Sequence, residues 1–237
     1  MKKNYFLLLG ILMLAGTAAQ AQQATDVLLR QQLTLAYKTA QRWTVSGKYF
    51  LYLHDNATRF DKSVLGLELN YKIFPWLEAG VEYRYGMNHE QDGHEFRYSL
   101  EGEYSPKKSR YELKWRTLLE QSTDYFDRDY LAVHPVKNVW RNRLMAAYKI
   151  HKKTDIYVLT EFYLGWKNST SQWQQTNYGI GADYQLKRRH SFNAEVQYRD
   201  YHYKKTNADI VRIDVGYKLS LGYQKPKKKK KGKGAAE

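Results

Sequence analysis

Apolar and polar residues alternate one for one along most of this chain. In the stretch 65–73 the odd positions are Leu, Leu, Leu, Tyr and Ile, and the even positions include Glu, Asn and Lys. After Phe-Pro-Trp at 74–76, the same alternation resumes over 77–85. A period of two is typical of a β-strand with one apolar and one polar face. Two such strands with a short break between them predict an antiparallel hairpin.

The alternation recurs along the chain and predicts eleven strands. They lie at 32–38, 44–53, 65–73, 77–85, 96–104, 111–119, 140–150, 156–166, 178–186, 192–201 and 211–221. Short turns are expected at 39–41, 74–76, 106–108, 151–153 and 187–189, and longer loops at 54–63, 86–95, 121–138, 167–173 and 202–208. Because short and long connections alternate, all short turns should lie at one end of the fold and all long loops at the other.

This layout predicts an all-β fold: an up-and-down antiparallel transmembrane β-barrel of 10–12 strands, with short periplasmic turns and longer outer loops. Within lipid only helices and closed barrels satisfy every backbone hydrogen-bonding group. A soluble β-sandwich also has alternating strands and is the alternative. The long strands, the simple hairpin order and the unusually charged second face favour the barrel.

Aromatic residues on the apolar face add to this prediction, because barrels carry aromatic girdles at both membrane interfaces. Near the short turns lie Tyr37, Trp43, Tyr104, Tyr111, Tyr148, Tyr184 and Phe192. Near the long loops lie Tyr83, Tyr85, Phe96, Trp140, Trp166 and Tyr198.

The odd number of strands conflicts with the even counts of single-chain bacterial barrels. Eleven strands place the mature N-terminus on the outer side. Either the first strand lies outside the wall, or a twelfth strand escapes the pattern, or the segment 22–30 threads back through the lumen.

Three regions are expected. Residues 1–21 resemble a secretory signal peptide, with Lys2 and Lys3 before an apolar run and Ala19-Gln20-Ala21 as the cleavage site. Residues 22–224 form the barrel, and residues 225–237 a Lys-rich disordered periplasmic tail. About half of the net charge of +15 belongs to the signal and the tail, so the charge does not indicate nucleic-acid binding. An exported chain without cysteine is stabilised without disulfides.

Several stretches carry a family resemblance: "LNYKIFPWLEAGVEYRYG", "VWRNRLMAAYKI", "GADYQLKRRHSFNAEVQYRDY" and "DVGYKLSLGY". Together they are similar to a family of small bacterial outer-membrane β-barrels catalogued only as a domain of unknown function. The resemblance covers nearly all of the mature chain and implies a barrel in the outer membrane. It implies no reaction, and the Lys-rich tail has no counterpart in it.

The polar face is expected to line the lumen with charges of both signs. Arg141, Arg143 and Lys149 are predicted to form a basic wall, and Glu78, Glu82, Glu101 and Glu103 an acidic wall. If water separates the walls, the barrel is a narrow channel for small solutes or ions. If the charges pair, it is a closed barrel that acts structurally or docks through its loops or tail. A membrane-embedded hydrolase or acyltransferase is the weakest reading, because no nucleophile has a base beside it in the pattern.

The longest loop is the candidate for partner contact, because it mixes acids with aromatic residues. Its candidate residues are Asp124, Tyr125, Phe126, Asp127, Asp129 and Tyr130. His89, Asp92 and His94 have metal-ligand chemistry, but a solvated loop explains them better. No metal, cofactor or nucleic acid is therefore expected. The expected partner is outer-membrane lipid. The tail either binds an acidic periplasmic or membrane partner or is a solvated extension without a partner, and the second interpretation is preferred.

Overall fold

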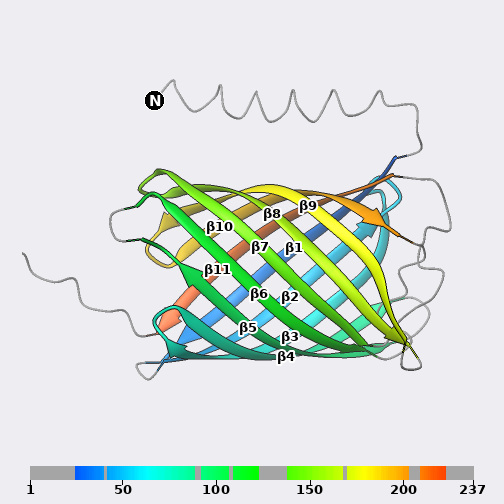
Figure 1. The fold of residues 1–237 in the computed structure, drawn as a ribbon, viewed down its shortest axis with the longest axis horizontal. Coiled ribbons are helices and arrows are strands. Elements are labelled where there is room, and N and C mark those ends of the chain that lie inside the picture. The colour runs from blue at the N-terminus through cyan, green and yellow to red at the C-terminus, as the bar shows by residue number, and fades with distance from the viewer. Residues whose placement is uncertain are drawn as a thin grey trace, which may run out of the picture.

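The computed structural model describes residues 25–39, 42–88, 92–106, 109–122, 138–167, 170–202 and 209–222. Within these ranges the chain forms eleven strands that close into one barrel (Figure 1). The strands are β1 (Thr25–Lys38), β2 (Trp43–His54), β3 (Arg59–Phe74), β4 (Leu77–Asn88), β5 (Gly93–Tyr104), β6 (Tyr111–Ser122), β7 (Asn138–His151), β8 (Thr154–Lys167), β9 (Thr170–Lys187), β10 (His190–Tyr201) and β11 (Asp209–Gly222). The predicted signal peptide and Lys-rich tail lie outside the described residues.

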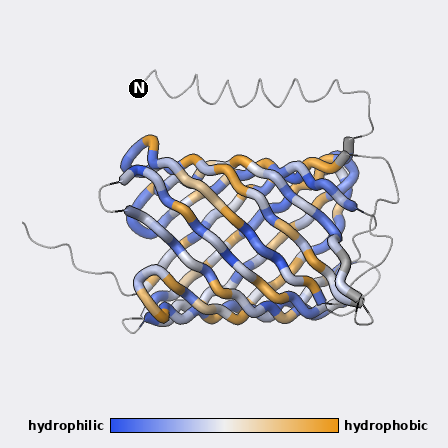
Figure 2. Tube along the Cα trace, viewed as in Figure 1, coloured by the Kyte–Doolittle hydropathy of each residue, from blue (hydrophilic) through white to orange (hydrophobic). Residues whose placement is uncertain are grey.

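The alternation of the sequence becomes the two faces of the barrel wall. Figure 2 shows hydrophilic and hydrophobic residues succeeding one another along the strands. Leu67 on β3 points outward and is 61% exposed, whereas Glu95 on β5 points inward and is 1% exposed. The predicted all-β barrel of eleven strands is confirmed.

The barrel closes through a parallel pair of strands. Each strand is hydrogen-bonded to its sequence neighbours in antiparallel order, and β1 pairs with β11 in parallel from Thr25↔Asp209 to Lys38↔Gly222. In a ring of hairpins with an odd number of strands, the first and last strands run in the same direction and must pair in parallel. The first strand therefore belongs to the wall, and Arg30 lies within it rather than on a segment inside the lumen.

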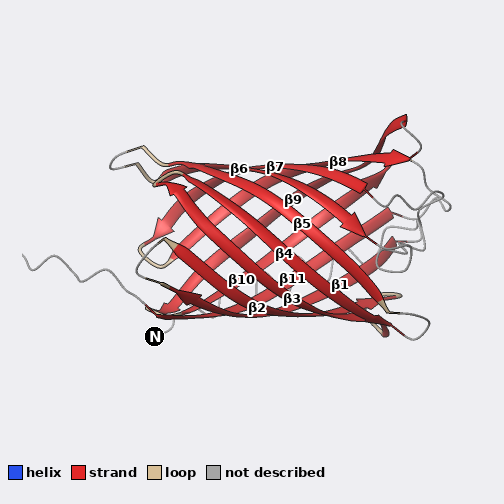
Figure 3. Cartoon of the chain, turned by 90° about the horizontal axis from the view of Figure 1, so that it is seen from below, coloured by secondary structure: helices blue, strands red, loops and turns tan. Residues whose placement is uncertain are grey.

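The two ends of the barrel carry different connections, as Figures 1 and 3 show. The turn end, on the left of both views, joins β1 to β2, β3 to β4, β5 to β6, β7 to β8, and β9 to β10. The loop end holds the start of β1 and the other five connections. This separation agrees with the sequence pattern.

Three of the predicted longer loops are present but shorter than expected. Residues 55–58 join β2 to β3, residues 89–92 join β4 to β5, and only 168–169 join β8 to β9. Register shifts next to Tyr52 and Tyr163 explain two of these differences, because a bulge moves the following side chains out of step with the alternation. Strand pairing continues beyond both bulges although the pattern in the sequence breaks.

The outer surface of the wall is apolar in its middle and aromatic toward both ends. Leu67 and Ile180 are each 61% exposed there. At the turn end, the rings of Tyr111 and Tyr148 lie 5.0 Å apart between centroids. At the loop end, the rings of Trp140 and Trp166 stack at 6.4 Å. Within the ranges described, no helix is long and apolar enough to cross a membrane.

Candidate functional site

The inner face of the barrel concentrates buried charge. Several of its charged side chains are buried: Glu82, Arg84, Glu95, Glu120, Arg141, Glu161, Glu195, Arg212 and Asp214. Burying a charge is costly unless it is paired and hydrogen-bonded. The contacts of these groups therefore determine whether the charges in the lumen are paired with one another or are exposed to water.

Arg141 on β7 is held by carboxylates from both neighbouring strands. Its guanidinium donates to Glu120 on β6 and, at 3.0 Å, to Glu161 on β8. It also lies over the ring of Tyr163, 4.5 Å from the centroid. The Tyr163 hydroxyl donates to the second oxygen of Glu161 at 2.8 Å. Arg141 thus links three strands through one buried cation.

The pairing continues through β5 and β4. Arg97 bridges Glu95 and Glu120, the latter at 2.7 Å. Arg84 lies 3.1 Å from Glu82 and 3.9 Å from Glu95. Each carboxylate in this chain of contacts has an arginine beside it. Two further contacts extend the chain to β2 and β3: Lys48 to Glu82 at 3.1 Å and to Glu68 at 2.8 Å.

A second branch crosses the lumen from β7 to β10. Arg143 donates to Glu195 at 2.7 Å, although the two residues are 52 apart in sequence. The hydroxyl of Tyr157 on β8 donates to the same carboxylate at 2.8 Å. Gly181 on β9 makes room for this tyrosine, because a Cβ at that position would lie 2.4 Å from its ring.

Ion pairs also join the parallel closure. Arg30 on β1 and Asp214 on β11 are register partners, and their side chains pair at 2.7 Å. Arg212 contacts Asp214 at 3.1 Å and donates to Gln197 on β10 at 2.6 Å. The closure is therefore supported by buried charges as well as by backbone hydrogen bonds.

These contacts form one layer across the lumen, which we call the ion-pair belt. Its members are Arg30, Lys48, Glu68, Glu82, Arg84, Glu95, Arg97, Arg116, Glu120, Arg141, Arg143, Glu161, Glu195, Arg212 and Asp214. Every strand except β9 contributes at least one member, and β9 adds Asn177, which is fully buried and donates to Gln197 and to Tyr163. Since Glu95 and Glu161 are each 1% exposed, side chains rather than water fill the lumen around them.

Open space remains on the turn-end side of the belt. One cavity of about 320 Å³ is lined by belt arginines together with Glu78, Glu101 and Lys114. A second, of about 580 Å³, lies nearer the turns. The two share lining residues: Gln32, Lys48, Glu68, Asp183 and Asn193. The lumen is thus a charged vestibule that leads from the turn end up to the belt.

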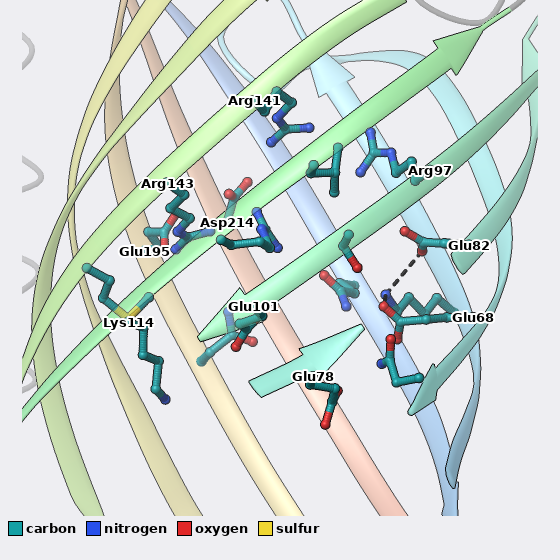
Figure 4. Close-up of a pocket in the computed structure, with 18 of the residues that line it drawn as sticks. Glu68, Glu78, Glu82, Arg97, Glu101, Lys114, Arg141, Arg143, Glu195 and Asp214 are labelled. Atoms are coloured by element: carbon teal, nitrogen blue, oxygen red, sulfur yellow. Dashed lines mark hydrogen bonds and ion pairs between the residues drawn. The ribbon is translucent and has the colours of Figure 1, made fainter. Parts of the chain in front are cut away.

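The residues of the two predicted walls have different environments. Arg141, Arg143 and Glu82 lie within the belt, each paired with charges of opposite sign. Lys149 is half exposed near the turn end and lies 4.0 Å from Asp155. Among the described residues, Glu78, Glu101 and Glu103 make no ion pair. Figure 4 shows Glu78 and Glu101 lying apart from Arg97 and Arg141. The structure therefore interleaves charges of both signs where two facing walls were predicted.

Two other predicted groups are only partly described. The candidate contact loop, from Asp124 to Tyr130, lies outside the described residues, as does His89. Asp92 accepts a hydrogen bond from the Tyr85 hydroxyl. The Nδ1 atom of His94 lies 2.6 Å from the hydroxyl oxygen of Tyr83. Across the described ranges, no group of three or more His, Cys, Asp or Glu side chains could hold a metal ion.

Sequence reasoning missed two members of the belt. The sequence pattern puts Glu95 in the loop 86–95, although Glu95 continues the alternation of β5 two residues before Arg97. Arg30 was placed before the first strand, although it stands two residues before the lumen-facing Gln32. Extending the alternation by a few residues at each strand end would have found both.

A family model described as "Protein of unknown function (DUF2490)" matches residues 31–208, which include most of the wall and the belt. No curated protein matches the chain. The match covers well over half of the sequence, so the chain belongs to the DUF2490 family.

Proposed function

We propose that this protein is an outer-membrane β-barrel with a sealed lumen. Three features support a location in lipid: the apolar outer face, the aromatic residues near both ends, and an N-terminus that resembles a cleaved signal peptide. A closed barrel leaves no unpaired strand edge, which hydrocarbon would penalise.

The observation that supports the sealed lumen is the ion-pair belt. A conducting pore needs a continuous path of water, with charged groups solvated along it. In the belt the carboxylates instead contact arginines, and several are almost completely buried. The protein would then act as a structural or docking element through its two ends.

The location can be tested by fractionation and gel mobility. We expect the protein in the outer-membrane fraction, resistant to extraction with high salt. Unboiled samples should migrate differently from boiled ones, because a closed barrel resists detergent unfolding. Recovery as a soluble periplasmic protein after salt washing would contradict the proposal and favour a soluble barrel.

A second candidate, a narrow channel, is favoured by the vestibule. The cavities of about 320 and 580 Å³ share charged lining residues, and among the described residues the belt lies between them and the loop end. If belt side chains move apart, ions could pass, and this candidate predicts conductance where the sealed barrel predicts none.

Planar bilayers distinguish the two candidates. Wild-type protein, with insertion verified by its unboiled gel band, is expected to give no discrete conductance steps. Neutralising Arg141 and Arg143 together should lower thermal stability, because it leaves Glu120, Glu161 and Glu195 with fewer partners. Discrete steps in the wild type, with ion preference shifted toward cations in the double variant, would contradict the sealed lumen and support the channel.

A further inference from the structure

The two ends of the barrel carry opposite charge among the described residues. The turn end is net basic: its turns and adjoining strand ends hold the acids Glu78, Glu103, Glu112 and Asp155 against the more numerous cations Lys38, Arg42, Lys72, Arg110, Lys149, Lys152, Lys153, Lys187, Arg188 and Arg189. The loop end has Asp26, Asp55, Asp61, Asp92 and Asp200 beside Arg59 and Lys62. Arg59 is itself 3.8 Å from Asp55. An anionic partner would therefore be attracted to the turn end.

A cavity of about 760 Å³ opens at the turn end. Its lining combines cations with apolar groups: Lys38, Arg42, Lys72 and Arg188, with Trp43, Phe74, Pro75 and Leu221. Among the described residues of this lining, Glu78 is the one acid. Cations and apolar surface side by side suit a ligand that is anionic at one end and apolar at the other.

Three of these cations differ from those of the belt. Lys38, Arg42 and Lys72 are exposed and make no ion pair with any described residue. In the belt, by contrast, each arginine lies beside a carboxylate. Glu78, which lines the same cavity and is the register partner of Lys72, offsets part of this positive charge, and the remainder is available to an anionic ligand.

Arg42 is held in place by the backbone around it. Its φ is +73°, in the left-handed region that residues with side chains seldom adopt. The Arg42 carbonyl accepts a hydrogen bond from the Lys72 amide at 3.0 Å, and its Nη1 donates to the Ile73 carbonyl at 3.1 Å. These bonds hold the guanidinium at the β3–β4 turn, beside Lys72, and its other nitrogens donate to no described residue. An unfavourable backbone held by its surroundings often marks a functional position.

We propose that this turn-end site binds the phosphate group of an anionic phospholipid, with Lys38, Arg42 and Lys72 as its ligands. Guanidinium and ammonium groups are the usual protein ligands of phosphate, and basic pockets at a membrane surface bind anionic headgroups. The apolar part of the lining favours a lipid over a free anion. The proposal rests on the proposed membrane location, which puts the aromatic residues at this end near the headgroups.

The test compares lipid nanodiscs of phosphatidylcholine alone with discs that also contain phosphatidylglycerol. The readouts are the thermal unfolding midpoint and the lipid retained in native mass spectrometry. The site variant carries Lys38→Gln, Arg42→Gln and Lys72→Gln. The control carries Arg110→Gln, Lys187→Gln and Arg189→Gln, which remove the same charge from the same end but lie outside the cavity lining. Phosphatidylglycerol should raise the midpoint and be retained in wild type and control, and retention should fall at least fivefold in the site variant.

Equal losses in both variants would mean general attraction to a basic surface and would overturn the proposal. So would equal stabilisation by inorganic pyrophosphate in neutral detergent, because the ligand would then be a free anion. If the site variant does not fold, the double variant Lys38→Gln, Lys72→Gln replaces it, since neither side chain makes a hydrogen bond to a described residue. If the protein inserts into both kinds of disc but phosphatidylglycerol changes neither the unfolding midpoint nor the retained lipid, only the proposed site is refuted. If the protein inserts into neither kind of disc, the membrane location is refuted as well.

Discussion

Replacing Arg141 by alanine is expected to destabilise the barrel by about 3–5 kcal/mol, the cost of stranding a buried charge when its partner is removed. Arg141 is 8% exposed, and its guanidinium contacts Glu120 and Glu161. Without it, both carboxylates lose a partner in a space that side chains fill. Urea unfolding in lipid, followed by the loss of the unboiled gel band, measures the free energy of unfolding.

Arg59→Ala is the matched control for this prediction. Arg59 also pairs with a carboxylate, Asp55 at 3.8 Å, but the two side chains are 71% and 55% exposed. An exposed pair contributes only about 0–1 kcal/mol, because water and salt screen it. Equal effects of Arg59→Ala and Arg141→Ala would mean that water reaches the belt and that the lumen is not sealed.

A double variant separates lost charge pairing from lost packing. Arg141→Met keeps much of the side-chain volume but strands the two carboxylates. Adding Glu120→Gln should restore part of the stability, since one stranded charge is removed and Arg97 keeps Glu95 as a partner. If the effects of the two substitutions on the free energy of unfolding are additive, the loss of stability arises from packing rather than from charge pairing.

The wall of the barrel was predictable because alternation assigns each residue to a face. It places Leu67 outside and Glu68 inside without reference to any distant residue. The parallel pairing of β1 with β11 was not predictable in this way. Which strand pairs with β1 on its second side, and in which direction, depends on the total number of strands in the closed barrel. The alternation within β1 is the same whichever strand lies beside it.

The ion pairs of the lumen were less predictable than the faces for the same reason. Glu120 and Arg141 lie on adjacent strands, so hairpin register brings them close. Arg143 and Glu195 meet only because the barrel is narrow enough for side chains of β7 and β10 to touch across it. The number and the tilt of the strands set the diameter of the barrel, and neither can be deduced from a short stretch of sequence. Sorting the charges by sign along the chain therefore suggested two walls where the closed ring interleaves them.

Replacing Leu67 by arginine is expected to cost about 2–4 kcal/mol if its side chain faces the middle of the lipid bilayer. Leu67 stands at the centre of β3, points outward and is 61% exposed, with Gly47 and Tyr83 as its register partners on β2 and β4. An arginine there would place a charge in hydrocarbon, or thin the lipid around it. Urea unfolding in bilayers measures the cost.

The control for Leu67→Arg is the same new side chain on the inner face, Gln32→Arg. Gln32 lies on β1 and lines both cavities of the vestibule, where carboxylates such as Glu68 and Asp183 are also in the lining. A cation there stays among polar groups, so the cost should be far below that of Leu67→Arg. In neutral detergent, which packs less tightly than a bilayer around the wall, the difference between the two variants should shrink. Similar costs for both in a bilayer would show that the apolar outer face does not meet lipid, and the wall would then have to be covered by another protein surface instead.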